Sequence, residues 1–352
     1  MDVSLFDFTL PEAAIALRPA VPRDSAKLLH IGAKGGFTDY RVSDLPTLLR
    51  AGDVLVLNET KVFAAALRGK RAAREHGGGS AVMVDVNLHT PVADTIWRAF
   101  IRPAKRVRPG DILTFSETLT GTVTDKQDGG DVGLVLETQG DLIEEINAAG
   151  EPPLPPYIAR KRKADEQDVE DYQTVYANET GSVAAPTAGL HFTDSVFSAL
   201  KAKGVQIERL TLHVGAGTFL PVKSDDTSTH KMHSERYSIS SETAENLNIA
   251  KSEGRRIVAV GTTSLRALES ACDENGIITD GATETDIFLT PGSDFKVVDG
   301  LMTNFHLPKS TLFMLVSALA GLDRMQEAYA HAIKRGYRFY SYGDSSLIWK
   351  AE

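Results

Sequence analysis

A run of small residues at positions 181–192 (GSVAAPTAGLHF) ends on a histidine beside an aromatic residue. Its glycines, Gly189 among them, permit backbone conformations and close approaches that larger residues resist. Thr187 and His191 supply polar atoms that a simple connection between two elements would not need. The pattern predicts a loop whose backbone lies close to a ligand. The same residues also fit a tight turn before a capped helix over residues 195–203.

Three residues within six positions, His230, His233 and Glu235, have side chains that transfer protons or bind metal ions. In an extended chain His233 and Glu235 point to the same side, because successive side chains alternate. An imidazole beside a carboxylate suits general acid–base chemistry. With a distant third ligand such as His191 or His213, the same group would suit a metal site. Ordinary surface polarity is the third interpretation.

A strand, loop and helix unit offers a place for an anion. Residues 256–260 (RIVAV) predict a buried strand, and residues 264–271 predict a helix just after Thr262 and Thr263. Backbone amides at the start of a helix bind anions such as a carboxylate. Helix capping alone would also explain the two threonines.

Familiar nucleotide-binding and hydrolase motifs are missing from the sequence. Residues 213–219 (HVGAGTF) contain a G-x-G after a predicted strand, but Leu220 and Pro221 break the dinucleotide-binding pattern. There is no G-x-x-x-x-G-K-[ST], no G-x-S-x-G and no H-E-x-x-H. The single Cys272 excludes an intramolecular disulfide and a cysteine-rich zinc site.

Charge is unevenly distributed along this acidic chain of net charge −9. Residues 67–109 hold nine basic residues against three acidic ones, and a second basic cluster follows at residues 160–163 (RKRK). A polyanion such as RNA would meet two positive patches on an otherwise negative protein. Two solvated faces are the alternative interpretation.

The pattern of apolar residues predicts a two-domain α/β protein. Residues 37–42 and 53–57 read as strands, and the second (DVLVL) is a continuous apolar run typical of a sheet covered on both faces. Short β-rich runs with intervening turns then predict a small antiparallel barrel inserted at residues 67–154. Helices and strands alternate again after the insert. We therefore expect an α/β domain formed by residues 1–66 and 155–352.

The chain also carries signals about its location. Its first residues lack the basic flank and apolar run of a secretory signal, and the apolar run at residues 312–320 is too short to span a bilayer. Together with the single cysteine, these features predict a soluble cytoplasmic protein.

Several of these stretches together resemble one family. The matching segments are 181–192, 213–219, 230–235, 260–266, 303–311 (TNFHLPKST) and 341–344 (SYGD), with 52–53, 58–60 and 154–157 in support. They resemble the S-adenosylmethionine:tRNA ribosyltransferase-isomerases of queuosine biosynthesis, and the resemblance covers nearly the whole chain.

The resemblance implies a three-layer α/β domain with an inserted β-barrel. It also implies an enzyme that transfers and isomerises the ribosyl part of S-adenosylmethionine onto 7-aminomethyl-7-deazaguanine at the wobble position of tRNA. The product would be epoxyqueuosine in tRNA, and adenine and methionine would be released. S-adenosylmethionine is then a consumed co-substrate, no metal is expected, and the enzyme is expected to be a monomer that binds no membrane.

The chemistry of such a reaction suggests roles for individual residues. A sulfonium acidifies the neighbouring C5′ hydrogens, so a base can remove one, and adenine leaves more easily when it is protonated. We expect Glu235 or His233 as the base and His191 or His306 as the proton donor. An aromatic ring face would stabilise the sulfonium, and a helix start with a guanidinium would hold the methionine carboxylate. The candidates are Phe192 or Phe305 for the ring, and Thr262, Thr263 and Arg266 for the carboxylate.

The other expected contacts lie in the same motifs and in the basic clusters. Expected substrate contacts are Thr187, Gly189, His213, Gly215, Gly217 and Asn304, and expected tRNA contacts are Lys105, Arg106, Arg108, Arg160, Lys161 and Arg162. Two other functions fit parts of the sequence. One is a noncatalytic tRNA-binding protein, and the other is a metal-dependent hydrolase that uses His230, His233 and Glu235.

Overall fold

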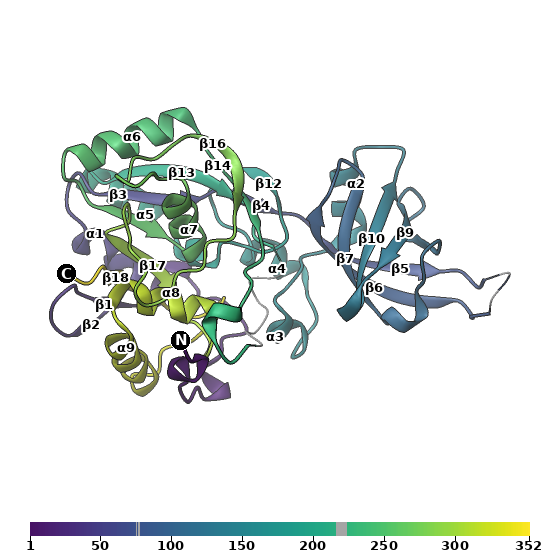
Figure 1. Ribbon diagram of the computed structural model, residues 1–352, viewed down its shortest axis with the longest axis horizontal. Coiled ribbons are helices and arrows are strands. Elements are labelled where there is room, and N and C mark those ends of the chain that lie inside the picture. Colours follow the sequence, from purple (N-terminus) through teal and green to yellow (C-terminus); the bar gives the residue numbers. More distant parts are fainter. Residues whose placement is uncertain (75, 77, 216–223) are drawn as a thin grey trace. The chain divides into compact units, whose positions relative to one another are not determined.

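The computed structural model describes residues 1–74, 76, 78–215 and 224–352, and this part of the chain forms two compact units (Figure 1). Unit 1 comprises Met1–Lys61, Gln173–Glu179 and Ala185–Glu352, and unit 2 comprises Val62–Tyr172 and Thr180–Ala184. The functional domain limits expected at residues 67 and 154 stay a prediction. Among the described residues, no helix combines the length and the apolar character that a membrane crossing requires.

A mixed sheet forms the centre of unit 1, and nine of its strands lie within the described residues. In order across the sheet these are β16 (Gly281–Thr285), β14 (Glu235–Ile239), β13 (Gln206–Leu212), β3 (Val54–Asn58), β15 (Ile257–Val260), β17 (Gly300–Asn304), β18 (Ser345–Trp349), β1 (Lys27–Ile31) and β2 (Phe37–Arg41). Strands β13, β3, β15 and β17 run parallel to one another. Their carboxyl ends therefore meet at one edge of the sheet.

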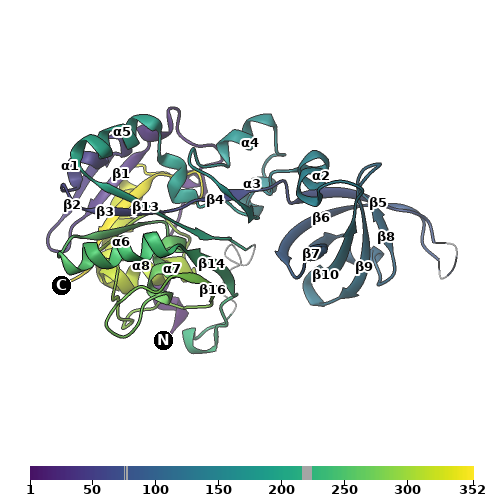
Figure 2. The same cartoon turned by 90° about the horizontal axis from the view of Figure 1, so that it is seen from above.

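Helices cover both faces of this sheet. Figure 2 shows α1 (Leu45–Leu48) and α5 (Asp194–Lys203) on one side, and α6 (Ser241–Ser252), α7 (Thr262–Ser270) and α8 (Thr311–Ala320) on the other. Helix α9 (Leu322–Lys334) packs against α8. All five residues of β3 are buried, because alternate side chains of this strand enter different layers. The fold expected for this part of the chain, an α/β domain of three layers, is confirmed.

The core between β3 and the first helical layer shows how the sequence sets these layers. Leu55 and Leu57 of β3 belong to one buried cluster with Val196 and Leu200 of α5 and with Leu45 of α1. Each such side chain contributes roughly 1.5–3 kcal/mol when it leaves water. Spacing of two in the strand and of four in the helix thus places one face of each element in the same core.

Unit 2 contains a closed antiparallel barrel. Its strands, in order around the barrel, are β5 (Ala66–Arg71), β6 (Val82–Pro91), β7 (Ile96–Arg102), β10 (Asp131–Glu137), β9 (Thr120–Lys126) and β8 (Ile112–Thr114). Pairing of Lys70 with Thr114 and of Arg71 with Leu113 joins β8 back to β5 and closes the ring. A short strand β11 (Gly150–Glu151) also pairs with β5. The expected inserted barrel is confirmed.

Shorter elements complete the two units. Strands β4 (Thr60–Val62) and β12 (Glu179–Ser182) pair with one another, and three helices follow the barrel strands: α2 (Leu142–Ala149), α3 (Pro156–Ala159) and α4 (Glu166–Asp171). Helix α4 begins just after Asp165 and ends at Asp171. Its start is set by a capping box in which Asp165 and Asp168 each accept from the other's backbone amide.

Candidate active site

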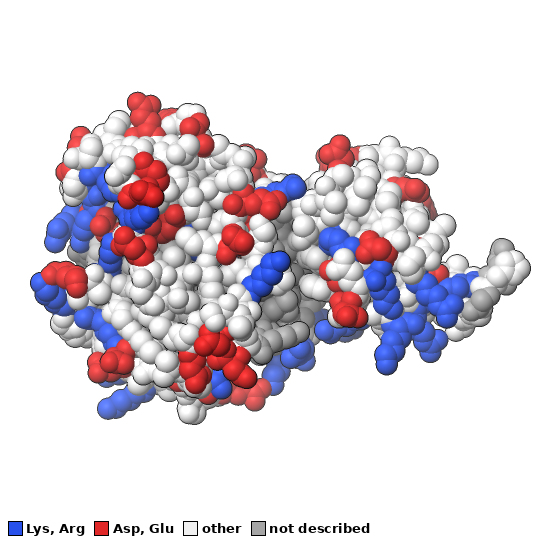
Figure 3. All heavy atoms as spheres, in the orientation of Figure 1, with Lys and Arg blue, Asp and Glu red and all other residues white. Residues whose placement is uncertain are grey.

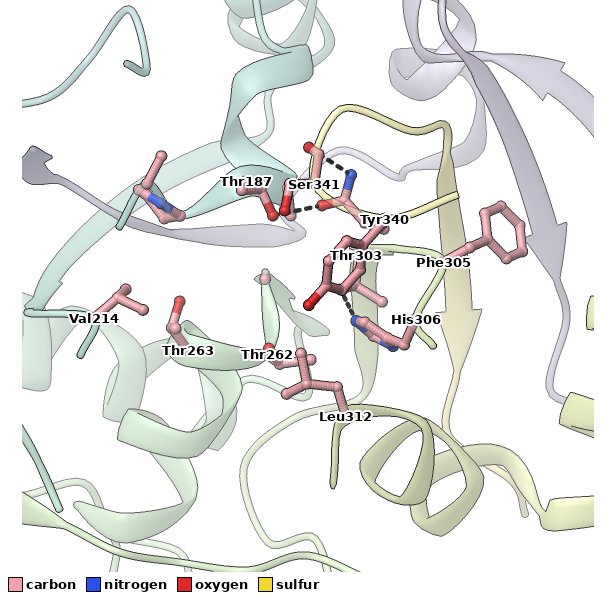
Figure 4. Close-up of a pocket in the computed structure, with 15 residues that line it drawn as sticks. Thr187, Val214, Thr262, Thr263, Thr303, Phe305, His306, Leu312, Tyr340 and Ser341 are labelled. Carbon is pink, nitrogen blue, oxygen red and sulfur yellow. Dashed lines mark hydrogen bonds between the residues drawn. The ribbon is translucent and has the colours of Figure 1, made fainter. Parts of the chain in front are cut away.

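A pocket in unit 1 lies at the edge where the parallel strands end (Figure 4). The segment after β15 contributes the start of α7, and the end of β17 contributes the next wall. The other walls come from the short helix Thr187–His191 and from a turn at Tyr340 and Ser341. Residues from four separate segments thus converge at the carboxyl edge of the sheet, the usual ligand position in α/β folds. The lining residues are Ala185, Pro186, Thr187, Ala188, Val214, Gly261, Thr262, Thr263, Thr303, Asn304, Phe305, His306, Leu312, Tyr340 and Ser341.

None of these lining residues carries a carboxylate, an ammonium or a guanidinium group. His306 is fully enclosed, and burial lowers the pKa of its imidazole to about 3. Its Nε2 lies 3.3 Å from the hydroxyl of Thr303, and its Nδ1 lies 3.4 Å from the hydroxyl of Tyr329. The described part of the pocket wall is therefore uncharged near neutral pH, with hydroxyl, amide and imidazole groups as its polar atoms.

Asn304 connects three walls of the pocket. Its Oδ1 accepts a hydrogen bond from Thr187 at 3.0 Å, and its Nδ2 approaches the carbonyl of Ser341 at 3.5 Å. Figure 4 shows Thr187 and Ser341 side by side at this connection. The same Nδ2 lies 3.3 Å from Nε2 of His191. Burial lowers the pKa of His191 to about 4, so the neutral ring accepts at Nε2 and carries its hydrogen on Nδ1.

Asn58 joins the ends of β3, β13 and α7. Its Nδ2 donates to the carbonyl of Leu212 at 2.9 Å and to the hydroxyl of Thr263 at 3.3 Å. Its Oδ1 accepts from the backbone amides of Leu212 and Thr60. Thr60 in turn places its hydroxyl 2.9 Å from Nδ1 of His213, a histidine whose pKa is lowered by burial. Asn58 therefore holds a pocket wall in place, a role that its sequence motif did not reveal.

Glu235 and Arg266 form a buried ion pair beside the pocket rather than in its lining. Glu235 begins β14, and its Oε1 also accepts from the backbone amide of Gly215 at 3.1 Å. Arg266 projects from α7, and its Nε donates to the carbonyl of Ile287 at 3.2 Å. The expected base and the expected carboxylate-binding guanidinium are therefore bound to each other in the protein alone.

The two phenylalanines expected to face a sulfonium are fully buried. Phe192 belongs to the core cluster and stacks on Phe197, with ring centroids 5.2 Å apart. Phe305 lines the pocket, but its ring packs against Tyr329, Tyr337 and Phe339. Neither ring has exposed surface in this structure.

The remaining predicted residues differ in position. Gly189 is buried against Tyr176. The two residues lie so close that a Cβ built on Gly189 would be 1.9 Å from the tyrosine hydroxyl. The close approach expected at this glycine is thus made to the protein itself. His233 is exposed, and the ring of His230 contacts Phe288. Across the described ranges, no three His, Cys, Asp or Glu side chains form a group that could hold a metal ion. Gly217 lies outside the described residues.

Tyr340 is a pocket residue that the sequence reasoning missed. Its backbone has a φ of 75°, one of two positive values recorded for residues other than glycine among the described positions. The tyrosine-rich segment before Gly343 and Asp344 was the available signal, but a sequence does not display φ angles. Its neighbour Ser341 falls in one of the family segments and faces the same pocket.

The basic residues form two structurally different groups. Lys105, Arg106 and Arg108 are exposed on unit 2, and Figure 3 shows lysine and arginine side chains gathered along one side of that unit. Arg160 and Lys161 are exposed as well. Arg162 differs, because its two terminal nitrogens bind both oxygens of the buried Asp168 at 2.6 and 2.7 Å.

The chain is similar to known proteins over nearly its full length. A sequence family described as queuosine biosynthesis protein matches residues 3–348. An S-adenosylmethionine:tRNA ribosyltransferase-isomerase of Maricaulis maris is 61% identical over 349 residues, with 99% of each chain covered. A protein of that name from Phenylobacterium zucineum is 58% identical, with both chains fully covered. The crystal structure of an S-adenosylmethionine tRNA ribosyltransferase from Thermotoga maritima matches with a TM-score of 0.55 and 33% identity, covering 98% of this chain and all of its own.

Proposed function

The chain belongs to the queuosine biosynthesis protein family, and from this premise we propose that it is itself an S-adenosylmethionine:tRNA ribosyltransferase-isomerase. Its reaction transfers the ribosyl part of S-adenosylmethionine to 7-aminomethyl-7-deazaguanine at the wobble position of tRNA and isomerises it. Epoxyqueuosine forms in the tRNA, and adenine and methionine leave. The proposal includes a monomer that acts in the cytoplasm and uses no metal ion.

One observation carries the proposal beyond the family match. The pocket at the carboxyl edge of the sheet combines uncharged walls with the start of α7. Gly261 precedes this helix with a φ of 88° and forms no side-chain cap. We propose that the first helical amides, near the hydroxyls of Thr262 and Thr263, bind the methionine carboxylate. Neutral polar groups elsewhere in the pocket suit the nucleoside part of the same substrate.

The ion pair of Glu235 and Arg266 suggests how binding of the methionine carboxylate prepares the removal of a C5′ proton. The methionine carboxylate competes with Glu235 for Arg266, one helical turn beyond Thr262. A guanidinium that turns to the substrate leaves the Glu235 carboxylate with one partner fewer, so that the carboxylate can accept a proton. Glu235, or the exposed His233, then removes a C5′ proton next to the sulfonium. The aminomethyl group of the tRNA base supplies the nucleophile.

Adenine must gain a proton as it leaves. His191 and His306 remain the proposed donors, and both are neutral rings in the protein alone. A neutral imidazole donates from its N–H and must regain that hydrogen from a neighbour. His306 has the hydroxyls of Thr303 and Tyr329 within reach for this exchange.

The tRNA is proposed to contact the exposed basic residues on unit 2 and those at residues 160 and 161. Phosphate groups provide most of the affinity in such contacts, and the affinity falls as salt displaces them. Arg162 is also among the tRNA contacts expected from the sequence. Its bidentate contact with Asp168 favours a structural role for its guanidinium.

The decisive experiment incubates the protein with S-adenosylmethionine and tRNA that bears the aminomethyl precursor. Adenine and methionine should appear one for one with modified tRNA after exhaustive chelation of metal. Methylated tRNA with S-adenosylhomocysteine as the coproduct would contradict the proposal. tRNA binding without adenine release would support the noncatalytic alternative, and a chelator-sensitive hydrolysis would support the metal-dependent one.

A further inference from the structure

We propose that Tyr340 provides the ring on which the adenine of S-adenosylmethionine stacks, an inference that rests on the proposed function. Among the described residues that line the pocket, Tyr340 and Phe305 are the aromatic ones apart from the histidine. Phe305 is fully enclosed by other rings. Tyr340 is partly exposed, and Figure 4 shows its ring and hydroxyl directed into the pocket.

The backbone at Tyr340 indicates that the side chain is required there. A φ of 75° is readily adopted by glycine but is unfavourable for a residue with a Cβ. Strained residues of this kind persist where the surrounding structure fixes them, and they concentrate at ligand sites. A tyrosine at this position is consistent with a ligand site, because its ring faces the pocket.

The turn around Tyr340 is held from both sides. The amide of Tyr340 donates to the carbonyl of Phe305 at 2.9 Å, and its own carbonyl accepts from Gly343 at 2.9 Å. The carboxylate of Asp344 accepts from the amide of Arg338 at 2.8 Å and is bound by the guanidinium of the same residue. Gly343 packs so closely that a Cβ there would lie 2.5 Å from the backbone of Arg338. The backbone that carries Tyr340 is thus held in place before any ligand arrives.

The chemistry of the walls selects a neutral, planar group as the partner of this ring. None of the described residues that line the pocket carries a carboxylate, so none of them compensates a buried cation. The hydroxyls of Thr303 and Ser341, which line the pocket away from the start of α7, can both donate and accept, as the edge of a purine requires. Stacking of a base on an aromatic side chain depends on the π-face and not on charge. Adenine fits this combination better than the sulfonium does.

Binding measurements on three variants test the inference. Calorimetry with adenine, S-adenosylmethionine and the uncharged thioether S-adenosylhomocysteine should show similar affinities for the parent and Tyr340→Phe. Tyr340→Leu and Tyr340→Gly should weaken binding of all three ligands by roughly tenfold or more. Tyr40→Leu, which removes a partly exposed tyrosine of β2 outside the pocket, is the matched control and should change none of them.

Two results would overturn the inference. Parent-like binding by Tyr340→Leu is the first. The second is a loss confined to S-adenosylmethionine, since the thioether differs from it by the methyl group and the charge on sulfur, and the ring would then face the methylsulfonium. Urea unfolding separates ligand binding from packing: Tyr340→Gly should unfold at the same or a higher urea concentration than the parent, because glycine relieves the strained φ. A clear decrease would make the ring a structural element and also overturn the inference.

The adenine-release assay separates this inference from the proposed function. A parent protein that releases adenine, together with a Tyr340→Leu variant that binds adenine normally, refutes the role of Tyr340 alone. A parent that neither binds S-adenosylmethionine nor releases adenine refutes the proposed function, and the inference falls with it.

Discussion

The carboxylate of Glu235 is bound to the guanidinium of Arg266 inside unit 1, where both side chains are almost wholly buried. Two charges removed from water stabilise a protein only while they remain together. Loss of one partner leaves the other buried and uncompensated. The pair therefore links the chemistry proposed for Glu235 to the stability of the sheet edge between β14 and α7.

Glu235→Gln should affect turnover and stability together. Replacing a proton-accepting carboxylate by an amide should lower the rate of adenine release by about 10²-fold or more. The same change leaves Arg266 without its counter-charge and should lower the free energy of unfolding by about 3 kcal/mol. Adenine release and urea unfolding measure the two effects on one sample.

Glu284→Gln is the matched control for this change. Glu284 lies on the neighbouring strand β16 and forms an exposed ion pair with Arg236 at 3.4 Å. Exposed pairs contribute at most about 1 kcal/mol, so stability should hardly change. Parent-like turnover in Glu235→Gln would assign the base to His233 or to a residue outside this cluster.

The buried histidines predict how stability depends on pH. Burial lowers the pKa of His191 to about 4 and that of His306 to about 3, both below the value of about 6.5 in an unfolded chain. As pH falls below 6.5, these two histidines therefore bind protons in the unfolded chain but stay neutral in the folded chain. The two histidines should not lower the free energy of unfolding above that pH. Toward pH 4 the free energy of unfolding should decrease by on the order of 1 kcal/mol per pH unit for each histidine.

Urea unfolding between pH 4 and pH 7 measures this dependence. His306→Gln should flatten the slope, because the variant lacks one of the buried histidines whose pKa is lowered. His233→Gln removes an exposed histidine and should leave the slope unchanged. An equal slope in the parent and His306→Gln would show that His306 gains protons freely in the folded protein.

Neutralising Lys105, Arg106 and Arg108 together should weaken tRNA binding and reduce its dependence on salt. Each lost phosphate contact removes about one unit from the slope of log affinity against log salt. Affinity for S-adenosylmethionine should stay the same. Filter binding of tRNA at several salt concentrations, with calorimetry for S-adenosylmethionine, tests both statements.

Neutralising Lys201 and Lys203 on α5 provides the control, since both are exposed and lie on unit 1. An unchanged salt slope in the triple variant would place the path of the RNA elsewhere, with Arg160 and Lys161 the next candidates. Arg162→Gln should behave differently from all of these variants, because it breaks the contact with Asp168 and lowers stability.

Gly189→Val should destabilise the wall that carries Thr187. Any Cβ at position 189 would overlap the hydroxyl of Tyr176 at 1.9 Å and crowd Thr174 at 3.0 Å. The variant should therefore unfold at a lower urea concentration and also bind S-adenosylmethionine more weakly. Gly36→Ala introduces a Cβ with nothing within 4 Å and should be neutral in both measurements. Parent-like stability of Gly189→Val would show that Tyr176 moves aside at little cost.

Local signals were sufficient to predict much of the fold. The apolar run that became β3 and the strand, loop and helix that became β15 and α7 were predicted close to their observed positions. Strands β1 and β18 were missed, because each is short and their pairing joins residues at opposite ends of the numbering. Residues 142–149 read as part of a β-rich insert, whereas an Asp141 cap starts a helix there.

The site was harder to predict than the fold. The threonines at the start of α7 and the histidine at position 306 were predicted near a ligand, and the structure places them around one pocket. The pairing of Glu235 with Arg266 was not visible, because 31 residues separate the two charges in the sequence. Phe192 is fully buried and so cannot face a ligand in this structure, and Tyr340 was recognised by its positive φ angle. Neither property is visible in the sequence. Such properties arise only when distant segments meet.

The position of β18 has a consequence for how unit 1 is made. In the order of the sheet, β1 and β2 connect to the other strands through β18. Lys27 at the start of β1 bonds to Asp344, 317 residues later, just before β18 begins. A ribosome must therefore synthesise almost the whole chain before the first two strands gain their neighbour. Until then the hairpin of β1 and β2 has an unpaired edge, to which a strand of another chain could add.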